Sequence, residues 1–184
     1  MLTSANLDLR FYGLWTVVFL AFPIAGLVAN WATGGITDVG RALLGGAFAG
    51  LILGAAQYGV LRTVLPLTAV WIVATAIGLA LGLAAATLGL GTAVNDNSLL
   101  FRGLVTGGVL ALAQAAVLLP LGPLAAVWAV VVALAWPLGW WVTRSIGVDL
   151  SPRWVAFGAS GAIVFQLLTG AALRLGLGLL MSGR

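Results

Sequence analysis

The stretch GAFAGLILGAAQYGVLRTVLPLTAVW, residues 46–71, is followed 57 positions later by GLVTGGVLALAQAAVLLPLGPLAAVW, residues 103–128. The two stretches share glycines, a glutamine, a proline and a final tryptophan in one ungapped register. Each has the pattern of an apolar helix, a short proline-marked turn and the start of a second apolar helix. The sequence therefore predicts an internal repeat whose unit is a helical hairpin.

Apolar segments around these stretches are long enough to cross a bilayer. The 184 residues are 62% hydrophobic and 7% charged, with a mean hydropathy of +1.19, whereas soluble domains carry about 25% charged residues. A bilayer core of about 30 Å needs about 20 apolar residues in a helix. We therefore expect one all-α membrane domain with six transmembrane helices, near residues 11–31, 41–62, 66–90, 100–119, 122–143 and 154–174.

The repeat continues more weakly towards both chain ends. Trp15 lies within one residue of the position equivalent to Trp71, and Pro23 lies two periods before Pro137. Gln166, in the last span, matches the repeated glutamine of the two hairpins. The first and last spans are therefore expected to form a third hairpin, in contact with each other. We predict three related hairpins in a pseudo-threefold bundle.

Small residues line one face of the repeated helices, at spacings that bring them together around a helix. Such faces let helix backbones approach closely, and this contact replaces the hydrophobic effect in lipid. We expect them to join helices and to hold the chain in a homo- or hetero-oligomer with other membrane proteins. The residues given this packing role are Gly46, Gly50, Gly54, Gly103, Gly107, Gly78, Gly82 and Gly139.

The repeated glutamines are the most specific polar feature of the spans. An unpaired amide in hydrocarbon loses several kcal/mol, so Gln57, Gln114 and Gln166 should face protein or water. In one interpretation each amide bonds a neighbouring helix, with Thr75, Thr106 and Thr169 as partners. In the other, the three amides line a shared pore or ligand site.

Eight tryptophans are present, and this side chain prefers the headgroup level of a membrane. That preference explains Trp15, Trp71 and Trp128, which lie near predicted helix ends, although Trp71 and Trp128 are also candidates for lining a pore or ligand site. Trp136 is more central and is expected to face lipid, a partner or a flat ligand. No cofactor is predicted, with a pigment or lipid as the alternative left open.

The chain lacks His, Cys, Lys and Glu altogether. Zinc sites, cysteine nucleophiles and histidine general bases are therefore excluded, and we predict no catalytic residue, no metal site and no enzymatic activity. The eight arginines are scattered singly along the chain, so a nucleic-acid surface is not expected. The lipid bilayer is the expected partner.

The pattern Gly46, Gly50 and Gln57, followed by Leu61 and Arg62, is a Gly-x3-Gly-x6-Gln helical hairpin. It resembles uncharacterised small multi-spanning bacterial membrane proteins, and the resemblance implies no activity. We expect a bacterial inner-membrane location. The arginine counts of the two membrane sides are equal, and three aspartates on the far side slightly favour cytoplasmic termini.

The leading functional expectation is a structural or accessory membrane subunit. The alternative is a passive pore, or a binding protein for a small neutral or apolar molecule. A binder of pigments or lipids is the third.

Overall fold

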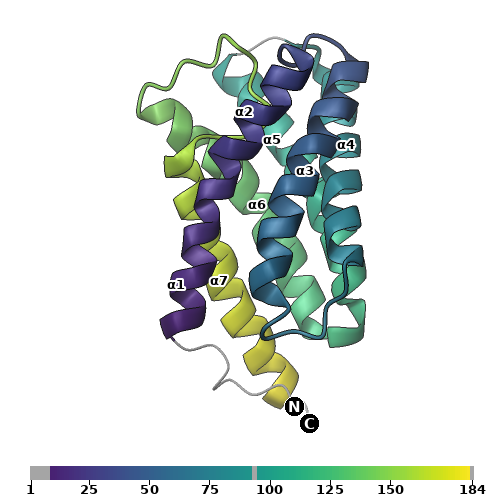
Figure 1. The fold of residues 1–184 in the computed structure, drawn as a ribbon, viewed down its shortest axis with the longest axis vertical. Coiled ribbons are helices and arrows are strands. Elements are labelled where there is room, and N and C mark those ends of the chain that lie inside the picture. Colours follow the sequence, from purple (N-terminus) through teal and green to yellow (C-terminus); the bar gives the residue numbers. More distant parts are fainter. Residues whose placement is uncertain (1–8, 93–94, 183–184) are drawn as a thin grey trace.

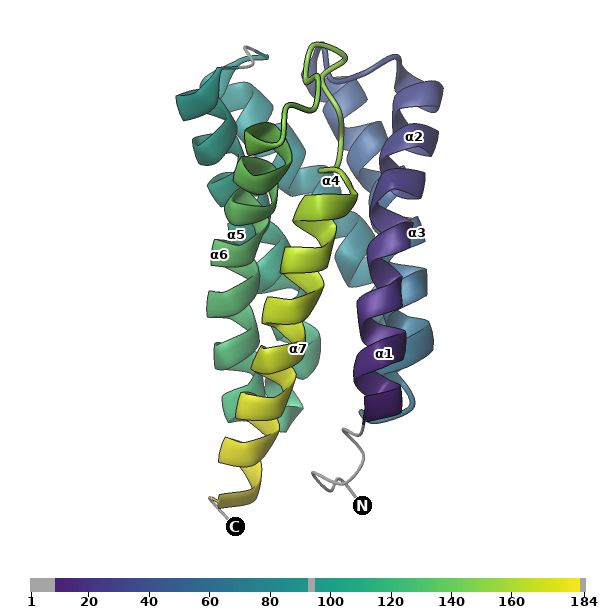
Figure 2. The same ribbon diagram turned by 90° about the vertical axis from the view of Figure 1, so that its left-hand side faces the viewer.

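The computed structural model describes residues 9–92 and 95–182 (Figure 1). Within these residues every regular element is a helix, and six helical spans are long and apolar enough to cross a membrane. The helices stand side by side along the long axis of the molecule (Figures 1 and 2). The predicted class, an all-α protein with six membrane-spanning helices, is confirmed.

The first span is divided into α1 (Leu9–Val17), the short 3-10 helix η2 (Val18–Leu20) and α2 (Ala21–Thr33). Pro23 explains this break, because proline has no N–H to donate to the carbonyl of Phe19, and the chain tightens into a 3-10 turn before it.

The remaining spans are continuous α-helices. They are α3 (Val39–Leu61), α4 (Val70–Leu90), α5 (Asp96–Leu118), α6 (Pro123–Ser145) and α7 (Ala159–Ser182), with the 3-10 helix η3 (Leu119–Leu121) between α5 and α6. A helix of 23 residues, such as α3, is about 35 Å long, which is enough to cross the hydrocarbon core.

The last span begins later than predicted. Residues 154–158 were expected to be helical, but residues 146–158 form a loop, and α7 starts at Ala159. Val155 and Phe157 in this loop are buried, so their apolar character reflects burial in the loop and not a membrane helix. Asn30 of α2 holds the loop: its side chain donates to the Pro152 carbonyl at 3.1 Å and accepts from the Val155 N–H at 3.2 Å.

The spans are arranged so that the first and the last are neighbours. Each span contacts the next along the chain, and α7 also contacts α1 and η2. The start of α1 and the end of α7 lie at the same end of the bundle (Figure 2). The predicted contact between the first and last spans is therefore present, while the threefold relation of the hairpins stays a prediction.

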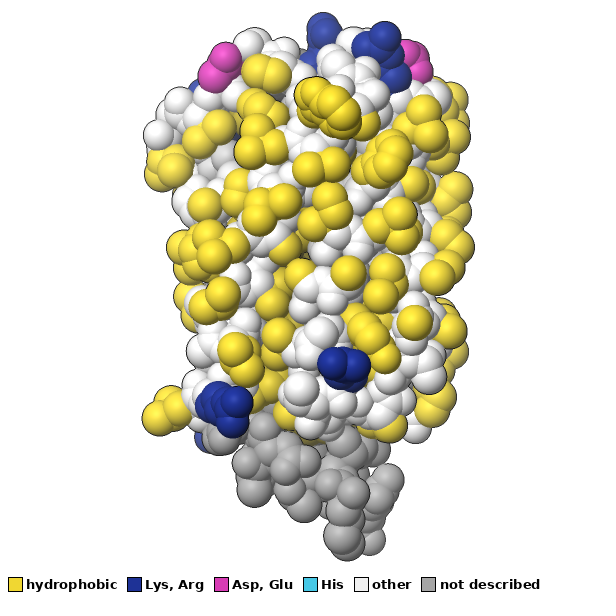
Figure 3. Space-filling view, in the orientation of Figure 1, with side chains coloured by type: hydrophobic (Ala, Val, Ile, Leu, Met, Phe, Trp, Pro, Cys, Tyr) yellow, Lys and Arg dark blue, Asp and Glu magenta, His cyan; other side chains and the backbone are white. Residues whose placement is uncertain are grey.

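The outer surface is typical of a protein immersed in lipid. Large apolar side chains are exposed along the spans, including Leu27, Ile77 and Leu112, each more than half exposed. In Figure 3 hydrophobic side chains cover the middle of the visible face, and the charged side chains lie towards its two ends. A bilayer environment for this belt follows from the cost of exposing so much apolar surface to water.

The predicted glycines lie where elements of this chain approach each other closely. A Cβ atom built on Gly46 would be 2.6 Å from the Cα of Ala80, and one built on Gly103 would be 2.8 Å from the Cα of Pro137. Both contacts join neighbouring helices, and their positions differ by 57 residues. The other predicted glycines are also close to a neighbouring element: Gly50 meets Ala76, Gly54 meets Ile72, Gly78 meets Leu110, Gly82 meets Thr106, Gly107 meets Trp136 and Gly139 meets Phe157.

Candidate functional site

Gln114 of α5 is the centre of a buried hydrogen-bond network. Its side-chain N–H groups donate to the side-chain oxygen of Gln57 on α3, at 3.2 Å, and to the hydroxyl of Thr75 on α4, at 3.0 Å. Its side-chain oxygen accepts a bond from the indole N–H of Trp128 on α6, at 3.0 Å. One fully buried amide therefore connects four helices.

Gln166 of α7 forms a second network with the first span. Its side-chain N–H donates to the backbone carbonyl of Trp15 at 2.6 Å. In return, the indole N–H of Trp15 donates to the backbone carbonyl of Gln166 at 3.0 Å and to the hydroxyl of Thr169 at 3.2 Å. Both side chains are buried, so these reciprocal bonds fix α1 against α7.

Three tryptophans link the two networks. The ring of Trp128 packs edge-on against Trp71, with centroids 5.6 Å apart, and against Trp15, at 6.1 Å. All three rings are at most 1% exposed. Their rings fill the space between helices, so their apolar area is removed from both water and lipid. Their depth relative to the headgroups stays a prediction.

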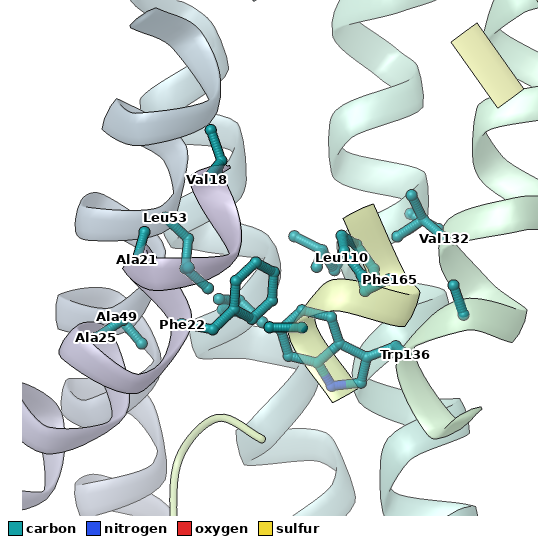
Figure 4. Packing of buried hydrophobic residues seen from close by; sticks show 14 of the residues in the cluster. Val18, Ala21, Phe22, Ala25, Ala49, Leu53, Leu110, Val132, Trp136 and Phe165 are labelled. Atoms are coloured by element: carbon teal, nitrogen blue, oxygen red, sulfur yellow. The ribbon is translucent and has the colours of Figure 1, made fainter. Parts of the chain in front are cut away.

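Trp136 also belongs to the core. Its ring packs against Phe22 of α2, Phe157 of the loop and Phe165 of α7, with centroids 4.8–6.1 Å apart. Figure 4 shows Phe22, Trp136 and Phe165 meeting between their helices. The prediction that Trp136 faces lipid, a partner or a flat ligand is wrong, since its ring is 1% exposed and surrounded by this chain.

The prediction that the glutamines turn into the bundle is confirmed for all three, since each is at most 2% exposed. Gln57 and Gln114 meet directly, whereas Gln166 is connected to them only through the tryptophans. Two of the proposed threonine partners take part, Thr75 with Gln114 and Thr169 with Trp15. The hydroxyl of the third, Thr106, is buried without a partner.

Several buried polar atoms of this core have unused hydrogen-bonding capacity. The indole N–H of Trp71, the side-chain oxygen of Gln166 and the hydroxyl of Tyr12 have no partner among the described residues. Buried polar groups are rarely left unpaired, so such atoms indicate where a water or a small polar molecule would bind. Whether Gln57, Gln114, Gln166, Trp71 and Trp128 line a pore or ligand site stays a prediction.

A cavity that the sequence did not predict lies at the end of the bundle opposite the start of α1 and the end of α7. Arg102 and Thr106 of α5, Trp140 of α6, and Arg153 and Trp154 of the 146–158 loop are among the residues that line it. Arg102 and Arg153 are separated by 51 positions, and only the folded loop brings them to one cavity. No sequence periodicity could have indicated this.

The two arginines of the cavity are held by the C-terminal end of α4 and the residues that follow it. Arg102 donates to the Gly91 carbonyl and to the Thr87 hydroxyl, and the Nε of Arg153 donates to the Thr92 carbonyl at 3.3 Å. Neither forms an ion pair in the described part of the chain, where the one salt bridge joins Arg41 to Asp38 at 3.4 Å.

Arg153 also has an unusual backbone conformation. Its φ is +54°, a left-handed value that costs a non-glycine residue of the order of 1–3 kcal/mol. Two backbone bonds hold it there: its N–H donates to the Leu150 carbonyl at 3.0 Å, and its carbonyl accepts from the Ile36 N–H at 3.2 Å.

The acidic groups near the loop are engaged locally. Both carboxylate oxygens of Asp149 accept bonds of 2.8 Å from Ser151, one from its N–H and one from its hydroxyl. These bonds stabilise the charged form and hold the pKa of Asp149 below its usual range. Among the described residues, no group of three or more His, Cys, Asp or Glu side chains could hold a metal ion.

Comparisons of the chain with family models, with curated proteins and with solved structures give no match. The function must therefore be argued from the contacts described above.

Proposed function

We propose that this protein is a non-enzymatic structural or accessory subunit of a bacterial inner membrane, with its termini in the cytoplasm. The observation that carries the proposal is the Gln114 amide, whose hydrogen bonds to Gln57, Thr75 and Trp128 connect four helices. Polar atoms used in this way hold helices in register. They are not free to replace the hydration shell of a permeating molecule.

The depth of this network also supports a structural role. Gln57 and Gln114 each lie four residues before the end of their helix, about 6 Å along the helix axis. A transport site near the bilayer midplane would need polar groups about 15 Å from the surface. The paired glutamines are instead placed to fix one end of the bundle.

The surface available to a partner differs from the one that the glycine pattern suggested. Gly46, Gly50, Gly103 and Gly107 are covered by helices of the same chain. A homo- or hetero-oligomer would therefore form through the lipid-facing belt, where Gly59 of α3 and Gly108 of α5 have no neighbouring atom within 4 Å of a built Cβ.

Extraction of the protein from its own membrane in a mild detergent tests the proposal. A structural or accessory subunit should migrate with a larger partner, and mass spectrometry should identify the same partner after chemical cross-linking. Replacement of Gly108 by Trp should reduce co-migration, whereas the same change at Gly178, which is also open, serves as the control. Migration as a monomer without cross-linked partners would contradict the proposal.

A passive pore or binding site for a small neutral molecule is the second candidate. It is favoured by the unpaired N–H of Trp71 and the unpaired oxygen of Gln166, which belong to one connected aromatic cluster. Flux of small neutral solutes into liposomes containing the protein tests it. A Gln166→Leu protein that folds but loses the flux would support a pore, and flux equal to that of empty liposomes would exclude it.

A further inference from the structure

The arginine cavity has a composition that suits a negatively charged ligand. Arg102 and Arg153 place two guanidinium groups around one space, and neither has a carboxylate partner in the described part of the chain. A guanidinium carries five N–H donors. The bonds described above occupy two donors of Arg102 and one of Arg153. The remaining donors can bind an anion, which would also relieve the repulsion between the like charges.

An unpaired hydroxyl is a second, independent indication that a ligand binds in the cavity. Thr106 lines the cavity, is 1% exposed, and its Oγ1 has no hydrogen-bond partner. A buried hydroxyl without a partner is costly, and a ligand oxygen in the cavity would provide one. The strained backbone of Arg153 is a further cost that is concentrated at this site.

An open apolar groove continues from the cavity. The two spaces share Trp140, Leu150 and Trp154 in their walls. The groove lies between α2, α6 and the loop, with Pro23, Leu27 and Phe157 among its lining residues. Its cavity volume is about 370 Å³, which is within the usual range of small-molecule sites.

The position of the cavity along the helices matches the headgroup level. Arg102 is six residues from the start of α5, about 9 Å along the helix axis. The guanidinium of Arg102 reaches back to the Gly91 carbonyl, just after the end of α4, so its charge lies at the level where the helices end and the interfacial region begins. Trp140 and Trp154 suit the same level, because tryptophan prefers the membrane interface.

Because the cavity carries two arginines and the adjoining groove is apolar, we infer that the site binds an anionic phospholipid. The phosphate lies in the cavity between Arg102 and Arg153 and accepts a bond from Thr106, and an acyl chain lies in the groove between α2 and α6. The other acyl chain stays in the bilayer.

Thermal unfolding of the purified protein in mild detergent, titrated with defined lipids, tests the assignment. Phosphatidylglycerol should raise the unfolding temperature at lower concentration than phosphatidylcholine with the same acyl chains. Arg153→Gln should weaken the apparent affinity for phosphatidylglycerol about fivefold, the effect of one interfacial arginine on an anionic lipid. The preference for phosphatidylglycerol should shrink by the same factor.

Two controls separate this site from general surface charge. Arg41→Gln removes the same charge from an exposed arginine that the cavity does not include, and should leave the preference unchanged. Arg102→Gln should act like Arg153→Gln, but it also removes bonds to α4, so Arg153→Gln decides the result. Glutamine, like arginine, is not a glycine, so the backbone strain at position 153 is the same in the Arg153→Gln protein as in the original.

Two further experiments test whether the ligand is a phospholipid with an acyl chain in the groove. Glycerol 3-phosphate, which has no acyl chain, should not compete at concentrations where phosphatidylglycerol saturates. Gly26→Leu should fill the groove and weaken binding of the lipid, because a Cβ at this position has only ordinary contacts with Ala156 and projects beside the groove. Equal responses to the two lipids, an unaltered Arg153→Gln protein, or full competition by glycerol 3-phosphate would overturn the inference.

Discussion

The side-chain amide of Gln114 donates a 3.2 Å hydrogen bond to the side-chain oxygen of Gln57, the residue 57 positions earlier that occupies the same place in the sequence repeat. The repeat thus brings two identical residues into contact. Their surroundings differ, since the indole of Trp128 donates to Gln114 while the equivalent indole of Trp71 has no partner. Gln114 therefore bonds to both helices of the other hairpin, through Gln57 of α3 and Thr75 of α4.

Replacement of Gln114 by Leu should destabilise the protein by about 2 kcal/mol. The change removes three hydrogen bonds, each worth about 0.6 kcal/mol in a membrane protein, and leaves the Trp128 N–H buried and unpaired. Equilibrium unfolding in mixed micelles measures the effect. Leu112→Ala, at a lipid-facing position of the same helix, is the control and should change stability less. A Gln114→Leu protein as stable as the original would show that the network has no structural role.

Gly50→Ala should be destabilising although alanine is the better helix former. The added Cβ would overlap the backbone of Ala76 on α4, and separating two packed helices costs about 1–3 kcal/mol. Gly108→Ala is a matched control, because nothing lies within 4 Å of a Cβ built there. Its stability should be unchanged or slightly higher. Equal effects of the two substitutions in the same unfolding assay would contradict the close approach of α3 and α4.

The sequence predicted the parts of the fold that depend on local periodicity. The six apolar segments, the inward glutamines and the close glycine contacts follow from helical spacing and the cost of polar groups in lipid. The burial of Trp136 was not predicted, because an apolar side chain near the middle of a span suits both lipid and the core. A tryptophan near a helix end can lie at the headgroup level and still be covered by neighbouring helices. Trp71, the second residue of α4, is completely buried. The arginine cavity depends on the path of the 146–158 loop, which has no periodic pattern.

The membrane orientation can be measured with single cysteines, because the chain contains none of its own. The natural positions nearest the chain ends that suit this experiment are Ser4 and Ser182, but Ser4 and the side chain of Ser182 lie outside the described residues. Thr63 and Ser151 are exposed in loops at opposite ends of the bundle. With cytoplasmic termini, Ser151→Cys should react with a membrane-impermeant reagent in intact cells, and Thr63→Cys only after lysis.

A lipid-facing cysteine at Leu112 is the control for this experiment and should stay unlabelled by a charged reagent in both conditions. Labelling of Thr63→Cys in intact cells, with Ser151→Cys protected, would reverse the orientation. Labelling of both from one side would contradict the arrangement of the spans.

A disulfide between Gly26→Cys and Ala156→Cys should form on mild oxidation and connect α2 to the loop. A Cβ built on Gly26 lies 3.8 Å from the Cβ of Ala156, which is the usual separation in a disulfide. Mass spectrometry after proteolysis detects the cross-link, and the pair Gly108→Cys with Ala156→Cys should give none. Because Gly26 and Ala156 both line the apolar groove, the oxidised protein should bind phosphatidylglycerol more weakly than the reduced one. Reduction should restore binding. A cross-link that forms with no effect on lipid binding would place the acyl chain elsewhere while leaving the loop position intact.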